Sequence, residues 1–371
     1  GLWIAIDLSS IALSAGAFML SAAVYLLGIK KLQPVARTAV FGCLIGYSMA
    51  CMCLLMDIGR PDRLWHGFVY WNIHSPLWEV TMCVGLYFTV LALEVIPIVG
   101  QSDLIQSRWP NLGNRMEGIH KLAPFLALAG LSFSMLHQSS LGATYGVLKA
   151  RPFWYKPSLA VLFMASAIVG GLAMTVLVSK IAGRVSKNVT VRDDLLDMVS
   201  KFIGWALVIY LYMRFWDFMG AEYTYMPGRS EAFHMLVSGP MAMNFWGGEI
   251  ILGIIVPMII LLSSRLRQDE RLHMLALFLV VGGLVAYRWD TNMVGQLVLL
   301  ADLTQGTTAS YTSYVPSLIE IMVGAGVVAY GALAVTLGIR YLRVVDHSGV
   351  EELAPQVEEF APARQPSLAG D

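Results

Sequence analysis

A histidine, a glutamine and two serines interrupt a long apolar run in the stretch MLHQSSLGATY, residues 135–145. His137, Ser140 and Thr144 are spaced three and seven residues apart, so in a helix they share one face. Ionisable groups inside a membrane are costly and are usually functional. Because histidine titrates near neutral pH, this stretch predicts a site that accepts or supplies protons in apolar surroundings.

Other apolar segments bring ionisable or polar groups to the level of His137. Counted from Lys121 at 1.5 Å per residue, His137 lies roughly 24 Å into a hydrocarbon core about 30 Å thick. The groups expected at the same depth are Asp7, Asp57, His74, Trp78 and Glu79. Each could be a helix cap or a packing residue, but their convergence favours a shared site. We predict catalytic roles for His137, Glu79 and Asp7.

A neutral hydroquinone fits these side chains better than a metal ion or a haem. His137 is the only histidine deep in an apolar segment, whereas a bis-histidine haem needs two at matched depth. A hydroquinone has an apolar ring and two hydroxyls that lose protons on oxidation, and a histidine backed by carboxylates can exchange those protons. The predicted quinone-binding residues are His137, Ser139, Ser140, Tyr145, Trp78 and His74.

The composition predicts an all-α polytopic membrane protein. Of the 371 residues, 57% are hydrophobic and 13% are charged, whereas soluble domains have about 25% charged residues. The net charge of zero gives no indication of nucleic-acid binding, and the four cysteines form no C-x-x-C pair that would indicate a metal site. We expect nine membrane helices, at residues 3–29, 35–56, 77–99, 121–148, 157–181, 199–219, 240–263, 272–300 and 315–341.

Most of the 25 Lys and Arg residues fall in the loops on one side of these helices. The positive-inside rule places that side, and the C-terminus with it, in the cytoplasm. The tail 344–371 is polar and rich in Glu and Pro, which predicts disorder. This orientation places Gly1 outside, so we expect one further helix before it.

The second half of the protein also carries ionisable residues in apolar segments. They are Asp217, Glu249, Arg288, Asp290 and Glu320. An arginine among acids in a membrane is expected to be paired. Two interpretations remain open, an ion-pair network that holds helices together and a path for protons.

Tryptophans gather at the predicted outer ends of the helices. They are Trp3, Trp65, Trp71, Trp78, Trp154, Trp216 and Trp246. An interfacial belt needs both membrane faces, so the outer excess favours a docking surface for another subunit, with a simple belt as the alternative. The basic loop with Lys149, Arg151 and Lys156 lies on the same side.

Residues 56–79, MDIGRPDRLWHGFVYWNIHSPLWE, resemble the signature of the NrfD/PsrC family of quinone-reactive membrane subunits. In that family a D-x-G-R-P-x-R corner precedes a Ser-Pro helix start. Three further segments resemble the HybB-like branch, the membrane subunit of nickel–iron hydrogenases: GLWIAIDLSSIALSAGAF, HQSSLGATY and YRWDTNMVGQLV. The resemblance spans residues 1–343.

The resemblance implies ten helices in the full protein, arranged as two stacked four-helix bundles, and no cofactor or haem held by this subunit. We place the first bundle at 1–148 and the second at 149–343. The family also implies a ferredoxin-like iron–sulfur subunit on the outer, periplasmic face, with catalytic subunits beyond it and quinone bound in the first bundle. The corner residues expected to brace one another or to meet this partner are Asp57, Arg60, Asp62, Arg63 and His66.

We therefore expect a membrane subunit of a respiratory complex that exchanges electrons between menaquinone or ubiquinone and an iron–sulfur protein. The resemblance favours quinone reduction in a hydrogenase-type complex. One alternative is quinol oxidation in a complex of the alternative complex III, polysulfide reductase or nitrite reductase type. Others are a proton-translocating subunit, a transporter and a purely structural anchor.

Overall fold

The computed structural model describes residues 1–185, 191–224, 226–303, 306–342 and 344–345. The first part of the protein forms α1 (Leu2–Ala17), α2 (Met19–Tyr25), η1 (Lys30–Leu32), α3 (Gln33–Asp57), η2 (Pro61–Arg63), α4 (His66–Val69), α5 (Pro76–Gly100), α6 (Asp103–Arg108), α7 (Pro110–Glu117), η3 (Gly118–Leu122) and α8 (Ala123–Gly146). The remainder forms α9 (Ser158–Val185), α10 (Asp193–Tyr223), α11 (Arg229–Val237), the π-helix η4 (Met243–Ile255), α12 (Val256–Leu262), α13 (Ser264–Gln268), α14 (Glu270–Leu297), β1 (Val298–Leu303), β2 (Gly306–Tyr311) and α15 (Leu318–Tyr341).

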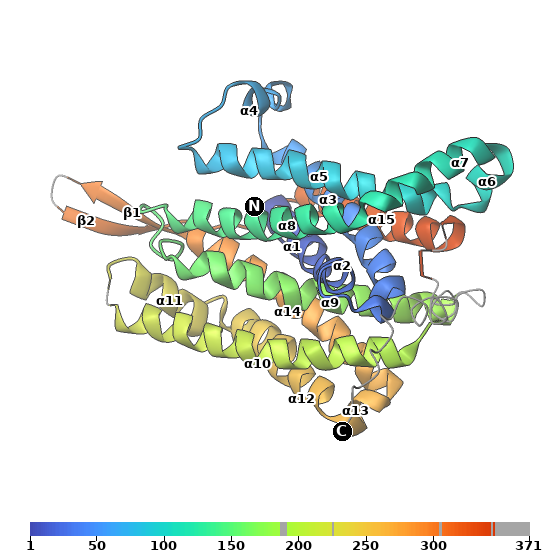
Figure 1. Cartoon of the computed structure of the whole chain (residues 1–371). Helices are drawn as coiled ribbons and strands as arrows, with labels where there is room; N and C mark the ends of the chain where they lie inside the picture. Colours follow the sequence, from blue (N-terminus) through green and yellow to red (C-terminus); the bar gives the residue numbers. More distant parts are fainter. Residues whose placement is uncertain (186–190, 225, 304–305, 343, 346–371) are drawn as a thin grey trace, which may run out of the picture.

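Nine helical stretches among the described residues are long and apolar enough to cross a membrane. They coincide with the nine predicted segments, and the all-α polytopic fold is confirmed. Three stretches begin five or more residues earlier than expected, and the second of the nine is one of them, since it starts at Lys30 rather than at residue 35. The fourth starts at Pro110 because α7 and η3 lead directly into α8, and the sixth starts at Asp193. In Figure 1 the long helices α5, α8, α9 and α10 run alongside one another.

The end of the eighth predicted segment was wrong. The sequence favours a helix to residue 300, but α14 ends at Leu297 and Val298 adopts an extended conformation. Strand β1 then pairs with β2 in an antiparallel hairpin, with Val298 opposite Tyr311. Helix and strand are difficult to separate by pattern in a short apolar run such as VLLADL, because both can bury it.

Helices α1 and α9 form the centre of the molecule. Helix α9 packs against α1 and α8, and also against α10 and α14. The backbones of α1 and α9 come very close, since a Cβ atom added at Gly16 would lie 1.6 Å from the carbonyl oxygen of Ala167. One added at Gly171 would lie 2.3 Å from the amide of Ala17. Such small-residue contacts are how membrane helices gain close packing without a hydrophobic driving force.

Helix α15 lies at the edge of the helix array and packs against α3 and α1. It therefore contacts helices of the first predicted bundle, although the division of the sequence at residue 148 places it in the second. That division stays a prediction. Val344 and Val345, at the start of the predicted tail, are buried, and the carbonyl of Val344 accepts a hydrogen bond from Thr38 at 3.1 Å. The remainder of the predicted disordered tail, 346–371, lies outside the described residues.

Candidate functional site

His137 forms a buried pair with a tyrosine from another helix. The ring of His137 on α8 is completely buried, and its Nδ1 lies 2.9 Å from the hydroxyl oxygen of Tyr47 on α3. The Nε2 atom is also buried and has no hydrogen-bond partner among the described residues. Since buried polar atoms in proteins are nearly always satisfied, Nε2 is a candidate contact for a ligand.

Aromatic rings enclose the pair on the side of α5. The ring of Tyr87 packs edge-on against Tyr47 with centroids 4.8 Å apart, and Phe18, between α1 and α2, packs against Tyr87 at 6.0 Å. The Tyr87 hydroxyl is buried without a hydrogen-bond partner in the described part of the protein. Sequence reasoning missed both tyrosines, although Tyr47 lies in the middle of an apolar run, LIGYSMA, where a phenolic hydroxyl needs a partner.

Several predicted site residues share this unsatisfied character. One carboxylate oxygen of Asp7, the hydroxyl of Ser140 and the indole nitrogen of Trp78 are buried with no hydrogen-bond partner among the residues the structure describes. Helix α1, which carries Asp7, packs against both α3 and α8. Ser139 differs, because its hydroxyl donates to the carbonyl of Leu136 within its own helix. Three helices therefore present atoms that can bind a polar ligand.

The structure gives no direct contact between Glu79 and His137. The Glu79 side chain is half-buried and makes no hydrogen bond or ion pair with the described residues. His74 is exposed on the loop before α5. Tyr145 packs against Trp154 with ring centroids 4.7 Å apart. The grouping of these three residues with His137 stays a prediction.

The assignment of Trp154 to the outer tryptophan excess was wrong, because its side chain is inside the protein. It is buried, and its indole nitrogen donates to the carbonyl of Thr291 at 2.6 Å. The ring lies directly against Gly295, where a Cβ atom would be 1.9 Å away. Trp154 therefore joins the loop before α9 to α14. Trp65, Trp71, Trp216 and Trp246 are exposed, as a belt or a docking surface requires.

The corner after α3 is an exposed turn. Gly59 has φ of +71°, a conformation that favours glycine, and Pro61 begins η2. We expected Arg60 and Arg63 to brace Asp57, but the described residues form no ion pair at this corner. Asp57, Arg60, Asp62 and Arg63 are exposed, and the half-buried His66 packs against Trp65 at 4.2 Å. The charged groups are thus accessible to a partner rather than committed to the fold.

A second buried polar cluster joins α10 to η4. The guanidinium of Arg214 lies 2.6 Å from Glu249 and 2.8 Å from Asp217, and Lys156 lies 2.7 Å from Asp217. All four side chains are at most 8% exposed. Burial lowers the pKa of Lys156, an effect that the charge of Asp217 opposes. Sequence reasoning identified both acids but missed Arg214, although Arg214 and Asp217 are three residues apart on one helical face. The assignment of Lys156 to the basic docking loop was wrong, because its side chain is buried against Asp217.

The other members of the proposed proton path lie apart from this cluster. Arg288 was expected to pair with an acid, but its Nη2 donates to the side chains of Gln138 and Ser166 and to the carbonyl of Phe163. Asp290 accepts a hydrogen bond from Asn244 at 2.8 Å. Glu320 forms the capping box at the start of α15 and accepts a hydrogen bond from Tyr314. The five residues therefore do not form one continuous series of contacts.

Comparison with known proteins places the protein among membrane subunits of one family. The menaquinone reductase integral membrane subunit of Nitratidesulfovibrio vulgaris is 30% identical over 93% of this protein and 83% of its own length. A selenate reductase subunit from Mesobacillus selenatarsenatis is 25% identical over 93% of this protein and 85% of its own length. A protein of Escherichia coli described as a probable Ni/Fe-hydrogenase 2 b-type cytochrome subunit is 25% identical over 93% and 83%.

The family model described as "Polysulphide reductase, NrfD" matches residues 1–301. This range includes both buried clusters, the exposed corner and eight of the nine membrane-spanning stretches among the described residues. The family resemblance inferred from the corner and from the His137 stretch is therefore confirmed. The chain is a multi-pass membrane protein that belongs to the NrfD family.

Proposed function

We propose that this protein is the quinone-binding membrane subunit of a respiratory oxidoreductase. The observation that carries the proposal is the buried His137–Tyr47 pair, whose Nε2 atom faces no protein partner in the described structure. Its relatives include a menaquinone reductase subunit and, more distantly, a polysulfide reductase component from Wolinella succinogenes. Their names support a quinone rather than a transported solute as the ligand.

The chemistry needs two protons and two electrons for each quinone. Reduction of a quinone to a hydroquinone forms two O–H bonds, and the electrons come from an iron–sulfur protein bound to the complex. The imidazole of His137 can donate a hydrogen bond or a proton to one quinone oxygen while Tyr47 holds the ring through Nδ1. Asp7 and Ser140 are positioned to bind or protonate other polar atoms of the ligand.

An apolar cavity lies on a different face of α3 from the pair. It has a volume of about 130 Å³ and lies between α1, α3, α9 and α15. Gly46 lines it together with Phe41, Met49 and Val335, whereas neither Tyr47 nor His137 lines it. Because an α-helix has 3.6 residues per turn, Tyr47 points about 100° away from its neighbour Gly46, toward α5 and α8.

His137 and His273, the two buried histidines among the described residues, do not fit the axial ligand pair of a haem, even though one relative is described as a b-type cytochrome subunit. The second buried histidine, His273, bonds Ser200 at 2.6 Å. On α14 it lies fifteen residues from Arg288, roughly 22 Å along the helix. Arg288 contacts Gln138, the neighbour of His137. Since both axial ligands must meet at one iron, His137 and His273 are not a haem pair.

Binding of a quinone analogue tests the proposal. The purified complex should bind a hydroxyquinoline N-oxide analogue at one site per copy of this subunit, with affinity at least about tenfold weaker in the Tyr47→Phe variant, because removing the phenol leaves Nδ1 unpaired. The measurement is a titration of ligand fluorescence. An exposed tyrosine, Tyr223, provides the matched control variant, Tyr223→Phe. Absence of saturable binding in the intact wild-type complex contradicts the proposal.

We further propose that a ferredoxin-like iron–sulfur subunit docks on the outer face, over the corner. The exposed charged residues there and the exposed rings of Trp65 and Trp71 support a protein partner. In this proposal the catalytic subunits lie beyond the iron–sulfur subunit. The protein lies in the inner membrane, and the positive-inside rule places its C-terminus in the cytoplasm.

Cross-linking checks this arrangement. A photoreactive residue introduced at Asp62 should cross-link to the iron–sulfur subunit, since this side chain is exposed next to the corner helix η2. The same residue at Arg265, on the opposite side of the predicted membrane, should give no such product. Cross-links from Arg265 alone would reverse the proposed orientation.

The segments around His137 and Arg288 resemble the HybB-like branch, so we propose that electrons flow toward quinone, which is reduced in a hydrogenase-type complex. Quinol oxidation is the second candidate, since the same pair can remove protons as well as supply them. The subunits that purify with this protein decide between the two. A protein that purifies alone and moves a solute without quinone is a transporter, and one that binds no quinone analogue within an active complex is a structural anchor.

A further inference from the structure

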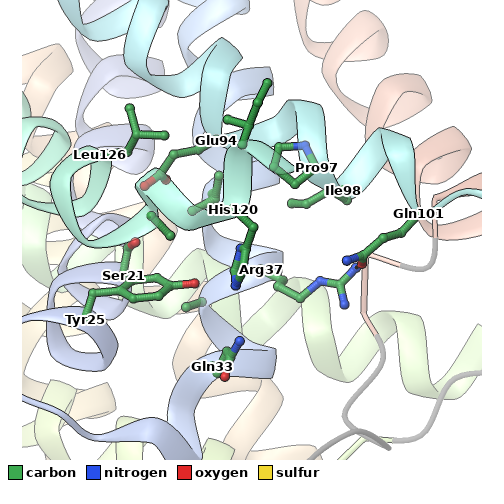
Figure 2. Close-up of a pocket in the computed structure, with 14 residues that line it drawn as sticks. Ser21, Tyr25, Gln33, Arg37, Glu94, Pro97, Ile98, Gln101, His120 and Leu126 are labelled. Carbon is green, nitrogen blue, oxygen red and sulfur yellow. Dashed lines mark hydrogen bonds between the residues drawn. The ribbon is translucent and has the colours of Figure 1, made fainter. Parts of the chain in front are cut away.

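A polar cavity lies at the opposite end of the first helices from the corner. It has a volume of about 110 Å³ and is bordered by α2, α3, α5 and η3 (Figure 2). The polar residues that line it include Ser21, Tyr25, Arg37, Glu94, Gln101 and His120. It lies near the loops that are rich in Lys and Arg, which the positive-inside rule places in the cytoplasm. A water molecule needs roughly 10–15 Å³, so several can enter.

The carboxyl group of Glu94 is the unexplained group in this cavity. Both of its oxygens are buried, and neither has a hydrogen-bond partner among the described residues. The nearby Arg37 donates to the side chain of Gln101 at 2.8 Å. Figure 2 shows the guanidinium extended toward Gln101, with the Glu94 carboxyl group on the side of Ser21. A glutamate inside a membrane helix without a partner is expensive, so a functional role is the default.

Glu94 lies on the same helical face as the tyrosine beside the quinone site. Tyr87 precedes Glu94 by seven residues, two turns of α5, so both project toward α1 and α3. On α1 and α2, Ser14 and Ser21 have the same spacing, and the hydroxyl of Ser21 is buried without a partner among the residues the structure describes. Polar groups from these helices and α5 therefore continue from the cavity toward the centre of the first helices.

Helix α3 adds Cys43 and Tyr47 to these polar groups. The Ser14 hydroxyl donates to the carbonyl of Cys43 at 2.5 Å, and the Cys43 thiol donates to the carbonyl of Ser14 at 2.8 Å. Tyr47 follows Cys43 by one turn of α3, packs against Tyr87, and bonds His137. Ser21 and Tyr87 thus lie between Glu94 and the pair at successive positions along their helices. Because their hydroxyls and the Glu94 carboxyl group make no hydrogen bond to the described residues, water molecules would have to bridge them.

We propose that Glu94 takes up protons from water in this cavity and passes them through the buried hydroxyl groups to the His137–Tyr47 pair. The proposal rests on the proposed function, because the pair must transfer protons to a quinone. For each quinone reduced, two electrons arrive from the iron–sulfur partner and two protons arrive from the side of the cavity. Electrons and protons then come from opposite faces, so turnover moves charge across the membrane. This path differs from the one predicted through Asp217, Glu249 and Asp290.

The test uses the whole complex in proteoliposomes, with the iron–sulfur subunit facing outward and a pH dye inside. Wild type should consume protons from the interior during quinone reduction. The isosteric Glu94→Gln variant should lose this uptake, with turnover at least about tenfold lower, because a proton-transfer group is absent. Glu94→Asp should restore part of both. Glu117→Gln changes a carboxylate of α7 at the same end and should behave as wild type.

Two outcomes separate the proposals. Interior proton uptake and turnover unchanged in Glu94→Gln overturn the proton route and leave quinone binding intact. Absence of quinone reduction and of analogue binding in wild type overturns the proposed function itself. If Glu94→Gln does not assemble, Ser21→Ala and Tyr25→Phe make the same test from other walls of the cavity. Unchanged interior uptake in both of those variants then also overturns the route.

Discussion

Replacement of His137 with alanine should lower quinone turnover of the complex by at least about 100-fold, the contribution expected of a positioned proton donor. The imidazole is completely buried and holds the Tyr47 hydroxyl at 2.9 Å. Its removal takes away the Nε2 atom proposed to contact the quinone and leaves the tyrosine hydroxyl without its partner. The measurement is electron transfer to a soluble quinone by the purified complex.

Electron delivery to the iron–sulfur partner should be unaffected in this variant, so reduction of an artificial dye by the catalytic subunits is the internal reference. His234 on α11 is exposed and gives the matched control, His234→Ala, which should retain wild-type turnover. His137→Gln retains a side chain able to hydrogen-bond but not to titrate, and should remain at least about tenfold slow. Wild-type turnover in His137→Ala would place the quinone site elsewhere.

The part of the fold that the sequence predicts well is the part that the bilayer determines. A span needs about 20 apolar residues, so hydropathy alone locates nine helices near their true bounds among the described residues. His137 could be identified for the same reason, since a histidine in such a run has few purely structural explanations. The corner could be predicted because glycine permits the positive φ that Gly59 adopts and proline fixes φ at Pro61, and both effects are local.

Helix rotation and neighbours are not encoded in such local rules. Tyr47 lies in an apolar run with no visible partner, and only the packing of α3 and α8 against their shared neighbours α5 and α9 brings it to His137. Glu79 and His137 were grouped because both were expected at the same depth in the membrane. Equal depth does not establish a contact between them, and the Glu79 side chain makes no hydrogen bond to the described residues. Hydropathy specifies how far a residue lies along the membrane normal, whereas a site also needs the angle about each helix axis.

Arg288 and Arg214, two of the three buried arginines among the described residues, show the same limit. Arg288 and Asp290 are two residues apart, so on a helix they face different directions, and Arg288 instead bonds Gln138 and Ser166. Arg214 is the residue that pairs with the acids, and its partner Glu249 comes from the π-helix η4. A π-helix changes the angle between successive side chains, so an α-helical reading of that segment misplaces Glu249.

Replacement of Arg214 with leucine should destabilise the protein by about 3–5 kcal/mol, because breaking a buried ion pair leaves an uncompensated charge. Arg214 forms ion pairs with both Glu249 and Asp217, and all three side chains are at most 8% exposed. Asp217 keeps Lys156 as a partner, whereas Glu249 has no other ion pair among the described residues. The measurement is thermal unfolding of the purified complex in detergent.

The matched control is Arg184→Leu, which breaks the exposed bridge between Arg184 and Glu270 and should have little effect on stability, because solvent screens this ion pair. The double variant Arg214→Leu, Glu249→Leu should recover a large part of the loss, because it removes both members of the pair. Equal destabilisation by Arg184→Leu and Arg214→Leu would contradict the view that burial makes this cluster important for stability.

The same cluster can be tested for proton conduction. A structural network predicts that Glu249→Gln and Asp290→Asn lower thermal stability but keep the proton yield per electron in proteoliposomes. A conducting cluster predicts the reverse, because glutamine and asparagine retain hydrogen bonds but hold no exchangeable charge. Because Glu249 and Asp217 are both tied to Arg214, a proton bound there must first displace an ion pair, which favours the structural outcome.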